Sequence, residues 1–411
     1  MPQNLRARLE RIRSTQGIKN PADIPAPQSE AKNINFSGWE EVGYKTLRRT
    51  LTMPFTLPAV LPEALPWLLP DLARYQKNVD PVLPRPDNFL FFDLETTGLS
   101  GGAGTVAFLA AFGRFVPGEG KQRGYCNLEV TQFLLLDYPG ENDFLEKILE
   151  LISNFNHPFF LTTYNGKAFD TPLLRTRCLM NGLAFPQLLQ LDLLHPARRL
   201  WKRIISSCSQ GNVETQVLGL DRSGDTPGAM APDIWFNFLR NEKERECIQA
   251  LLGICDHNVK DIFGLATMFK AFIEIAESPL DAAARFNCDE ENLAMCFRRN
   301  EAQKQTATLL LEAAAKSYPR SCLRLGFDYL RQGRFEKGRA ALKQLARPPV
   351  KWKVPCSLTV QALALRSLAI DAERRLGKKD IAVEYIERAA SLLPLPRGLL
   401  EDLEKRRERL S

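Results

Sequence analysis

The stretch Phe91–Thr105, FFDLETTGLSGGAGT, constrains the fold more than any other part of the chain. Residues 88–92 are mostly apolar, which is typical of a buried β-strand. Asp93 and Glu95 follow two positions apart, so on a strand their carboxylates point to the same face. Like charges on a buried face repel each other, and a divalent metal such as Mg²⁺ or Mn²⁺ is the natural ion between them. A solvated strand edge would explain the same pair, so the metal hypothesis needs acids elsewhere in the chain.

Length and composition limit the class of protein. A chain of 411 residues is too long for one core of ordinary size, so two or three domains are expected. The apolar content of 45% and charged content of 25% are those of a soluble globular protein. A net charge of +7 is compatible with a polyanionic partner but too low for a protein that coats nucleic acid.

Three further observations predict a cytoplasmic location. Nine cysteines without a Cys-x-x-Cys pair argue against a disulfide framework and a zinc site. The Arg-rich N-terminus lacks the apolar segment of a signal peptide. No segment approaches the ~20 apolar residues of a membrane span, so no membrane contact is expected.

Three regions are expected along the chain. Residues 1–86 predict a short basic helix, either solvated or in contact with nucleic acid, and then a Pro-rich collar. Residues 87–275 alternate strand and helix patterns, which predicts an α/β domain whose mixed sheet is flanked by helices. Residues 280–411 show helical patterns only. There, Gly333 and Gly377 are each followed five positions later by a small residue, which resembles tetratricopeptide-type hairpins, although an ordinary helical bundle explains the pattern nearly as well.

The expected elements can be given by residue range. Further strands are predicted at 106–115, 128–136, 159–163 and 188–193, and helices at 141–155, 170–181, 195–205 and within 235–275. A polar loop is predicted at 206–232. The predicted C-terminal helices are 301–315, 322–332, 334–345, 357–376 and 380–392.

A second acidic motif lies in the segment 162–177. An apolar strand runs into the turn Asn165-Gly166, and Asp170 opens the helix that follows. An Asp at this position has an ordinary role as a helix cap, which stabilises by about 1 kcal/mol. Asp170 is therefore either a cap or a further member of a metal site.

A third motif lies within a predicted helix. His257 and Asp261 are four residues apart, so they are neighbours on one helical face. The chain contains three histidines. His157 and His195 each precede a proline and are expected to be structural, whereas a His beside an Asp on an otherwise apolar buried face is less easily explained in that way.

The sequence motifs that contain the four acids and His257 resemble those of the DEDD exonucleases of the ribonuclease H-like superfamily. Within that group, the sequence resembles the YprB-type ribonuclease H-like domain. The resemblance covers roughly residues 35–275. It rests on five motifs in order: Asp93–Thr105, Tyr164–Leu174, Asp192–Lys202, Gly224–Gly228 and His257–Ile262.

This resemblance implies a mixed five-stranded sheet and hydrolysis of phosphodiester bonds with two metal ions. Asp93, Glu95, Asp170 and Asp261 are implied as ligands of two Mg²⁺ or Mn²⁺ ions, and His257 as the proton acceptor. The expected activity is a 3′-to-5′ exonuclease on single-stranded DNA or RNA. The sequence departs from the family pattern in one spacing. Three residues separate His257 from Asp261, which is the spacing of the Tyr-type branch of these exonucleases. In the His-type branch, four residues separate the His from the last Asp.

Residues beside these motifs are candidates for substrate binding. Arg198 lies in a basic cluster on the predicted helix 195–205, which either contacts phosphates or forms a solvated face. The glycines at 101–104 predict a hairpin turn, since no Lys-Ser/Thr follows them. A non-catalytic nucleic-acid-binding adaptor and an endonuclease are the alternatives to an exonuclease, and the C-terminal helices are expected to bind a protein partner. The four substrate-binding candidates are Thr96, Asn165, Lys167 and Arg198.

Overall fold

The computed structural model of the chain describes residues 36–98, 104–117, 125–155, 158–298, 303–347 and 352–410. The basic helix expected within residues 1–20, His157 and most of the expected glycine turn at 101–104 lie outside these ranges. The chain divides into a unit that ends at Trp39 and a second unit, Glu40–Ser411, which contains all of the elements below.

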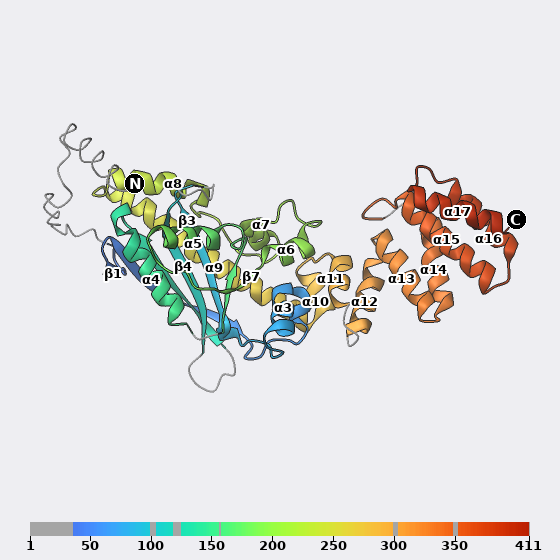
Figure 1. The fold of residues 1–411 in the computed structure, drawn as a ribbon, viewed down its shortest axis with the longest axis horizontal. Coiled ribbons are helices and arrows are strands. Elements are labelled where there is room, and N and C mark those ends of the chain that lie inside the picture. The colour runs from blue at the N-terminus through green and yellow to red at the C-terminus, as the bar shows by residue number, and fades with distance from the viewer. Residues whose placement is uncertain are drawn as a thin grey trace, which may run out of the picture. The chain divides into compact units, whose positions relative to one another are not determined.

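The second unit contains a seven-stranded mixed sheet (Figure 1). Its strand order is β1-β2-β5-β4-β3-β6-β7. The strands from β1 through β2, β5 and β4 to β3 pair antiparallel with their neighbours. Strand β6 pairs parallel with β3, and β7 pairs parallel with β6. The five strands from β5 to β7 in this order form the mixed five-stranded sheet that the resemblance implied. The strands are β1 (Glu40–Gly43), β2 (Thr46–Leu57), β3 (Phe89–Thr96), β4 (Ala107–Pro117), β5 (Tyr125–Leu135), β6 (Phe160–Thr163) and β7 (Leu189–Asp192).

The prediction of an irregular collar is wrong for residues 40–57, because β1 and β2 extend the sheet beyond β5. Strand β2 pairs antiparallel with β5 from Thr46 opposite Leu135 onward. Its sequence, TLRRTLTMPFTL, contains four threonines, whose β-branched side chains favour strands. The prolines within and after this segment favoured an irregular structure in the sequence analysis, because proline is uncommon in strands. The rest of the expected collar forms two helices, α2 (Leu65–Leu68) and α3 (Pro70–Asn78).

Helix α9 (Arg245–Glu277) crosses one face of the sheet. Phe89 and Phe91 of β3 pack on Phe269 of this helix, with ring centroids 4.5 and 5.8 Å apart. Gly113 on β4 permits the close approach, because a Cβ atom there would lie 2.4 Å from Cγ2 of Ile262. The opposite face of the sheet is covered by α4 (Glu141–Ser153).

The remaining helices of this region come between β6 and α9 in the sequence. The segment expected to be a loop contains a short helix, α7, which buries Val213 and Glu214 against α9. Seven residues are too few to show a helical period in the sequence. The helices are α5 (Asp170–Met180), α6 (Leu194–Trp201), α7 (Gln210–Gln216) and α8 (Ala231–Arg240).

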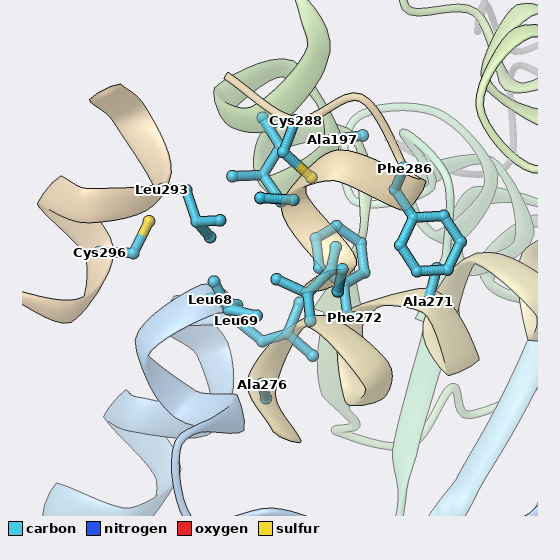
Figure 2. Close-up of a cluster of buried hydrophobic side chains, with 14 of the residues drawn as sticks. Leu68, Leu69, Ala197, Ala271, Phe272, Ala276, Phe286, Cys288, Leu293 and Cys296 are labelled. Carbon is cyan, nitrogen blue, oxygen red and sulfur yellow. The ribbon is translucent and has the colours of Figure 1, made fainter. Parts of the chain in front are cut away.

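Helices α10 (Pro279–Arg285) and α11 (Glu290–Phe297) continue the same hydrophobic core. Figure 2 shows Leu68, Phe272 and Leu293 side by side, contributed by α2, α9 and α11. All three are at most 1% exposed. The packed core therefore continues past residue 279.

Backbone and side-chain contacts also connect this pair of helices to α6. The Asp289 N–H donates to the Leu200 carbonyl at 2.8 Å, and the Trp201 indole donates to the Phe286 carbonyl at 3.0 Å. Arg203 forms an ion pair with the buried carboxylate of Asp289. Arg203, one member of the predicted basic cluster, is thus engaged within the protein.

The C-terminal helices form two antiparallel hairpins, α13/α14 and α15/α16, whose turns contain Gly333 and Gly377 at φ +75° and +64°. Gly338 allows close packing within the first hairpin, because a Cβ atom there would lie 3.1 Å from the Gly326 carbonyl oxygen. These hairpins agree with the expected tetratricopeptide-like region. The helices are α12 (Lys304–Ala314), α13 (Pro319–Arg331), α14 (Phe335–Ala346), α15 (Leu358–Arg374), α16 (Lys379–Ala390) and α17 (Arg397–Leu410). Across the described ranges, every helix is too short or too polar to cross a bilayer.

Candidate active site

Asp93 and Glu95 lie on β3 and face helix α9, as their two-residue spacing predicts. The side-chain amide of Asn258 on α9 donates to Oδ2 of Asp93 at 2.7 Å. The carboxylate of Glu95 has Nε2 of His257, also on α9, at 4.0 Å. Both acids therefore lie between the central strand and the long helix.

His257 and Asp261 lie on one face of α9, with Nε2 of the imidazole 3.2 Å from Oδ2 of the carboxylate. One ligand atom from each of Glu95, His257 and Asp261 lies within 4.8 Å of the other two. The fold therefore brings the third motif onto the first, although 161 residues lie between Glu95 and His257 in the sequence.

Asp170 is the first residue of α5 and is 7% exposed. The N-cap position of this helix is Phe169, so Asp170 lies one residue inside the helix. The negative charge of Asp170 raises the pKa of both Asp93 and Glu95, which places it in the same cluster.

Burial raises the pKa values of all four acids, and the charge of a neighbouring carboxylate adds to it in each case. Burial is the largest cause in each case, and it raises the pKa of Glu95 to about 8 and that of Asp170 to about 7. The pKa of Asp93 is raised well above its usual range by burial and then by Asp261. The pKa of Asp261 is raised by burial, against the opposing charges of His257 and Arg222. Such a cluster favours a bound cation, because a cation stabilises the charged carboxylates.

The donor set fits a hard divalent cation. Carboxylate oxygens are the ligands that Mg²⁺ and Mn²⁺ prefer, and a single imidazole beside them is compatible with Mn²⁺. No cysteine belongs to the group of possible ligands in the described part of the chain. The structure therefore brings together carboxylate and imidazole donors that could hold a divalent cation.

Asp225, which lies in the Gly224–Gly228 motif but was assigned no role from the sequence, contacts the other side of His257. Nδ1 of the imidazole lies 2.9 Å from Oδ2 of Asp225. Arg222 donates to the same oxygen at 2.8 Å, and Lys260 donates to Oδ1 at 3.0 Å. Although burial opposes ionisation, hydrogen bonds from Arg222, His257 and Lys260 lower the pKa of Asp225 to about 2. Its carboxylate is therefore charged at neutral pH.

Arg222 is the second residue that was missed. Its Nη2 atom lies 2.5 Å from Oδ1 of Asp261 and 2.5 Å from Oε2 of Glu214. The Arg222 guanidinium thus forms ion pairs with three acids, Glu214, Asp225 and Asp261. The last two also contact His257. An Arg three residues before an Asp in a polar loop was the available signal, but a surface pair gives the same pattern.

The Gly224–Gly228 motif lies against the site through its last residue. A Cβ atom at Gly228 would lie 2.9 Å from Nε2 of His257 and 3.7 Å from Oε1 of Glu95. Any larger residue would press on the imidazole, so Gly228 keeps space beside the acids.

A series of side-chain hydrogen bonds leads from strand β2 to Asp93. Gln132 on β5, which is 0% exposed, donates to Oδ1 of Asn258 at 2.8 Å and to the Cys255 carbonyl at 2.9 Å. Arg49 on β2 donates from Nε to Oε1 of Gln132 at 2.6 Å. Four side chains, Arg49, Gln132, Asn258 and Asp93, are therefore linked from an outer strand to the acidic cluster.

The four substrate-binding candidates have contacts of their own and stay predictions. The hydroxyl of Thr96 donates to the Gly98 carbonyl at 2.9 Å. Asn165 adopts φ +68°, and its N–H donates to Oδ1 of Asp192. Lys167 forms an ion pair with Asp71 at 2.6 Å, which compensates part of its charge. Arg198 is exposed on α6.

Comparison with known proteins agrees with this architecture. A family model described as RNase_H superfamily matches residues 90–273, so this part of the chain is similar to ribonuclease H-like domains. The chain is also 30% identical over 273 residues to a protein of Bacillus subtilis (strain 168), "Uncharacterized protein YprB". That match covers 64% of this chain and 60% of the relative, which is less than two thirds of its length. The predicted family resemblance and fold class are confirmed.

Proposed function

We propose that this protein is a metal-dependent 3′-to-5′ exonuclease that acts on single-stranded nucleic acid. One observation carries the proposal: four acids with raised pKa values, the buried Asp170 and the partly buried Asp93, Glu95 and Asp261, form one cluster in a ribonuclease H-like domain. Folds of this superfamily are typical of enzymes that hydrolyse phosphodiester bonds. The site residues agree with that chemistry.

The four carboxylates would hold two Mg²⁺ or Mn²⁺ ions. Bound ions supply charge stabilisation for the attacking and leaving oxygens of an in-line displacement at phosphorus. Asp93 lies on strand β3, and the charges of the three other acids all raise its pKa. It is therefore the best candidate to bridge both ions. Glu95 and Asp261, whose oxygens meet near His257, would hold one of them.

His257 would accept the proton of the attacking water at Nε2. The Asp225 carboxylate is ionised and accepts the Nδ1 proton, so the lone pair of a neutral imidazole lies at Nε2, toward Glu95 and Asp261. In hydrolysis the water oxygen forms a bond to phosphorus and the bond from phosphorus to the 3′ oxygen breaks. The leaving 3′ oxygen takes a proton from solvent, and the released nucleotide carries a 5′-phosphate.

A non-catalytic adaptor with the same fold is the main alternative. An adaptor has no use for four acids that repel each other in a buried site, because such a cluster destabilises the fold unless a cation is bound. Metal binding separates the two proposals. Addition of Mg²⁺ or Mn²⁺ should raise the melting temperature of the enzyme, whereas an adaptor without a metal site should show no change.

The direct test is digestion of end-labelled single-stranded DNA and RNA by the purified full chain with Mn²⁺ or Mg²⁺. A 5′-label should report a ladder that shortens from the 3′ end, and a circular single strand should stay intact. Asp93→Asn serves as the control for contaminating nucleases. Cleavage of the circle would indicate an endonuclease, and metal-independent or absent cleavage of every substrate would overturn the proposal.

A further inference from the structure

The positive charge of the chain is concentrated in its C-terminal helices. Residues 303–410 contain 23 lysines and arginines against 12 acids, which gives this region a net charge of +11. The remainder of the chain therefore carries −4, because the whole chain carries +7. Residues 36–302, which contain the ribonuclease H-like domain, carry 26 basic and 33 acidic residues, a net charge of −7. The domain with the candidate active site does not attract a polyanion by its own net charge.

A groove runs over α12, α13 and the beginning of α14. It consists of two adjoining hollows of about 520 and 500 Å³, which share Lys304, Thr308 and Gln332 in their walls. The basic residues of the groove are Arg298, Lys304, Arg331, Arg334 and Lys337, and its acids are Asp328 and Glu312.

Both acids of the groove are engaged by neighbouring groups. Asp328 accepts hydrogen bonds or ion pairs from Arg298 at 2.5 Å and from Arg331 at 3.5 Å. Glu312 accepts a hydrogen bond from the Tyr329 hydroxyl. Five basic residues against two acids leave the walls of the groove with an excess of positive charge.

Two basic residues at one end of the groove are held over an aromatic ring. The guanidinium of Arg334 lies 4.5 Å from the centre of the Tyr329 ring, and the Lys337 ammonium lies 5.9 Å from it. Arg331, Arg334 and Lys337 are all exposed. The charged groups of all three residues therefore face solvent at the groove.

We infer that this groove binds the phosphate backbone of single-stranded nucleic acid, so that the helical hairpins hold the substrate strand. The choice of nucleic acid over an acidic protein rests on the proposed function of the other domain. Contacts to phosphates need charge and polar groups without base reading, and Thr308 and Gln332 supply polar groups between the basic residues. This inference replaces the expectation that these helices bind a protein partner.

The test measures binding without hydrolysis. The full chain carrying Asp93→Asn is titrated, in EDTA, into fluorescent 20-nucleotide oligothymidylate and oligouridylate, and anisotropy is recorded over a series of KCl concentrations. The groove variant adds Arg331→Gln, Arg334→Gln and Lys337→Gln. The matched control adds Lys378→Gln, Lys379→Gln and Lys405→Gln, which remove the same charge from exposed positions outside the groove. Circular dichroism and melting temperature check that both variants fold.

The groove variant should bind about tenfold more weakly or worse at 100 mM salt, and its slope of log Kd against log salt should fall by about 2, since each lost single-strand phosphate contact contributes about 0.7. The control should bind like the parent. Equal effects in both variants, or no binding by the parent, would overturn the inference. So would tight groove-dependent binding of polyglutamate with no binding of either oligonucleotide. Because no metal is present, failure of the proposed hydrolysis would leave this result unaffected.

Discussion

Nδ1 of His257 lies 2.9 Å from Oδ2 of Asp225, and this contact determines which imidazole nitrogen faces the acidic cluster. Asp225 is fixed in turn by Arg222 and Lys260, which donate to its two oxygens. The orientation of the imidazole is thus set by a loop residue that lies 32 positions away in the chain.

Asp225→Asn should lower kcat by about 10- to 100-fold while KM and the metal-induced rise in melting temperature stay close to those of the parent. An amide at this position no longer requires a proton on Nδ1, so the lone pair no longer stays at Nε2. Steady-state kinetics and ¹⁵N-histidine NMR, with only three histidines to assign, measure both effects. If the NMR spectrum shows the same tautomer in parent and variant, Asp225 does not orient the base.

Asp93→Asn should reduce turnover by about a thousandfold or more and slightly stabilise the metal-free protein. The loss of activity follows from removal of the proposed bridging ligand. The gain in stability follows because the repulsion among Asp93, Glu95, Asp170 and Asp261 decreases. Digestion rates and thermal melts in EDTA give the two numbers. Turnover near that of the parent would exclude Asp93 from the site.

His257→Ala and Asp261→Asn should separate proton transfer from metal binding. Loss of His257 should cost about 10²–10⁴ in turnover and keep the stabilisation by Mn²⁺. Loss of the Asp261 charge should weaken both. Thermal shift against metal concentration, measured beside turnover, compares the two variants. Full activity of His257→Ala would show that the imidazole is structural and that solvent or another group takes the proton.

The stability of the metal-free protein should fall as pH rises from about 4 to about 8. Glu95 and Asp170 have folded-state pKa values near 8 and 7, above the ordinary values of about 4 in the unfolded chain. The folded state therefore binds more protons in this interval, and the stability that these groups contribute at low pH is lost as pH passes their folded pKa values. Denaturant melts in EDTA across this range test the slope, and saturating Mn²⁺ should remove most of it. A rise in stability over the same interval without metal would contradict the buried cluster.

A fragment ending at residue 298 should fold and bind metal, whereas one ending at 279 should aggregate. The shorter fragment lacks α10 and α11, and so exposes Leu68 and Phe272 and removes the acceptor of the Trp201 indole. This boundary is our proposal, in place of the division expected near Pro279. Equal solubility and equal metal-induced stabilisation of fragments 36–279 and 36–298 would refute it.

The residues that the sequence alone could assign share local patterns. The spacing of Asp93 and Glu95 on a strand, and of His257 and Asp261 on a helix, follows from the periods of these elements. Asp225 and Arg222 could not be assigned, because a polar loop has no period from which to place a side chain. Strand β2 was missed for a related reason, since only its pairing with β5, about 80 residues later, turns a proline-flanked segment into part of a sheet.

The link from Arg49 through Gln132 and Asn258 to Asp93 gives the outermost strands a role beyond extending the sheet. The Asn258 amide on α9 limits the rotation of the Asp93 carboxylate, and Gln132 and Arg49 hold that amide in place. The carboxylate therefore cannot adapt freely to ions of different radius. The geometry of the site is thus partly set by residues 46–57, outside the segment that matches the family model. In the proposed metal site, strand β2 would therefore help to set the selectivity between Mg²⁺ and Mn²⁺.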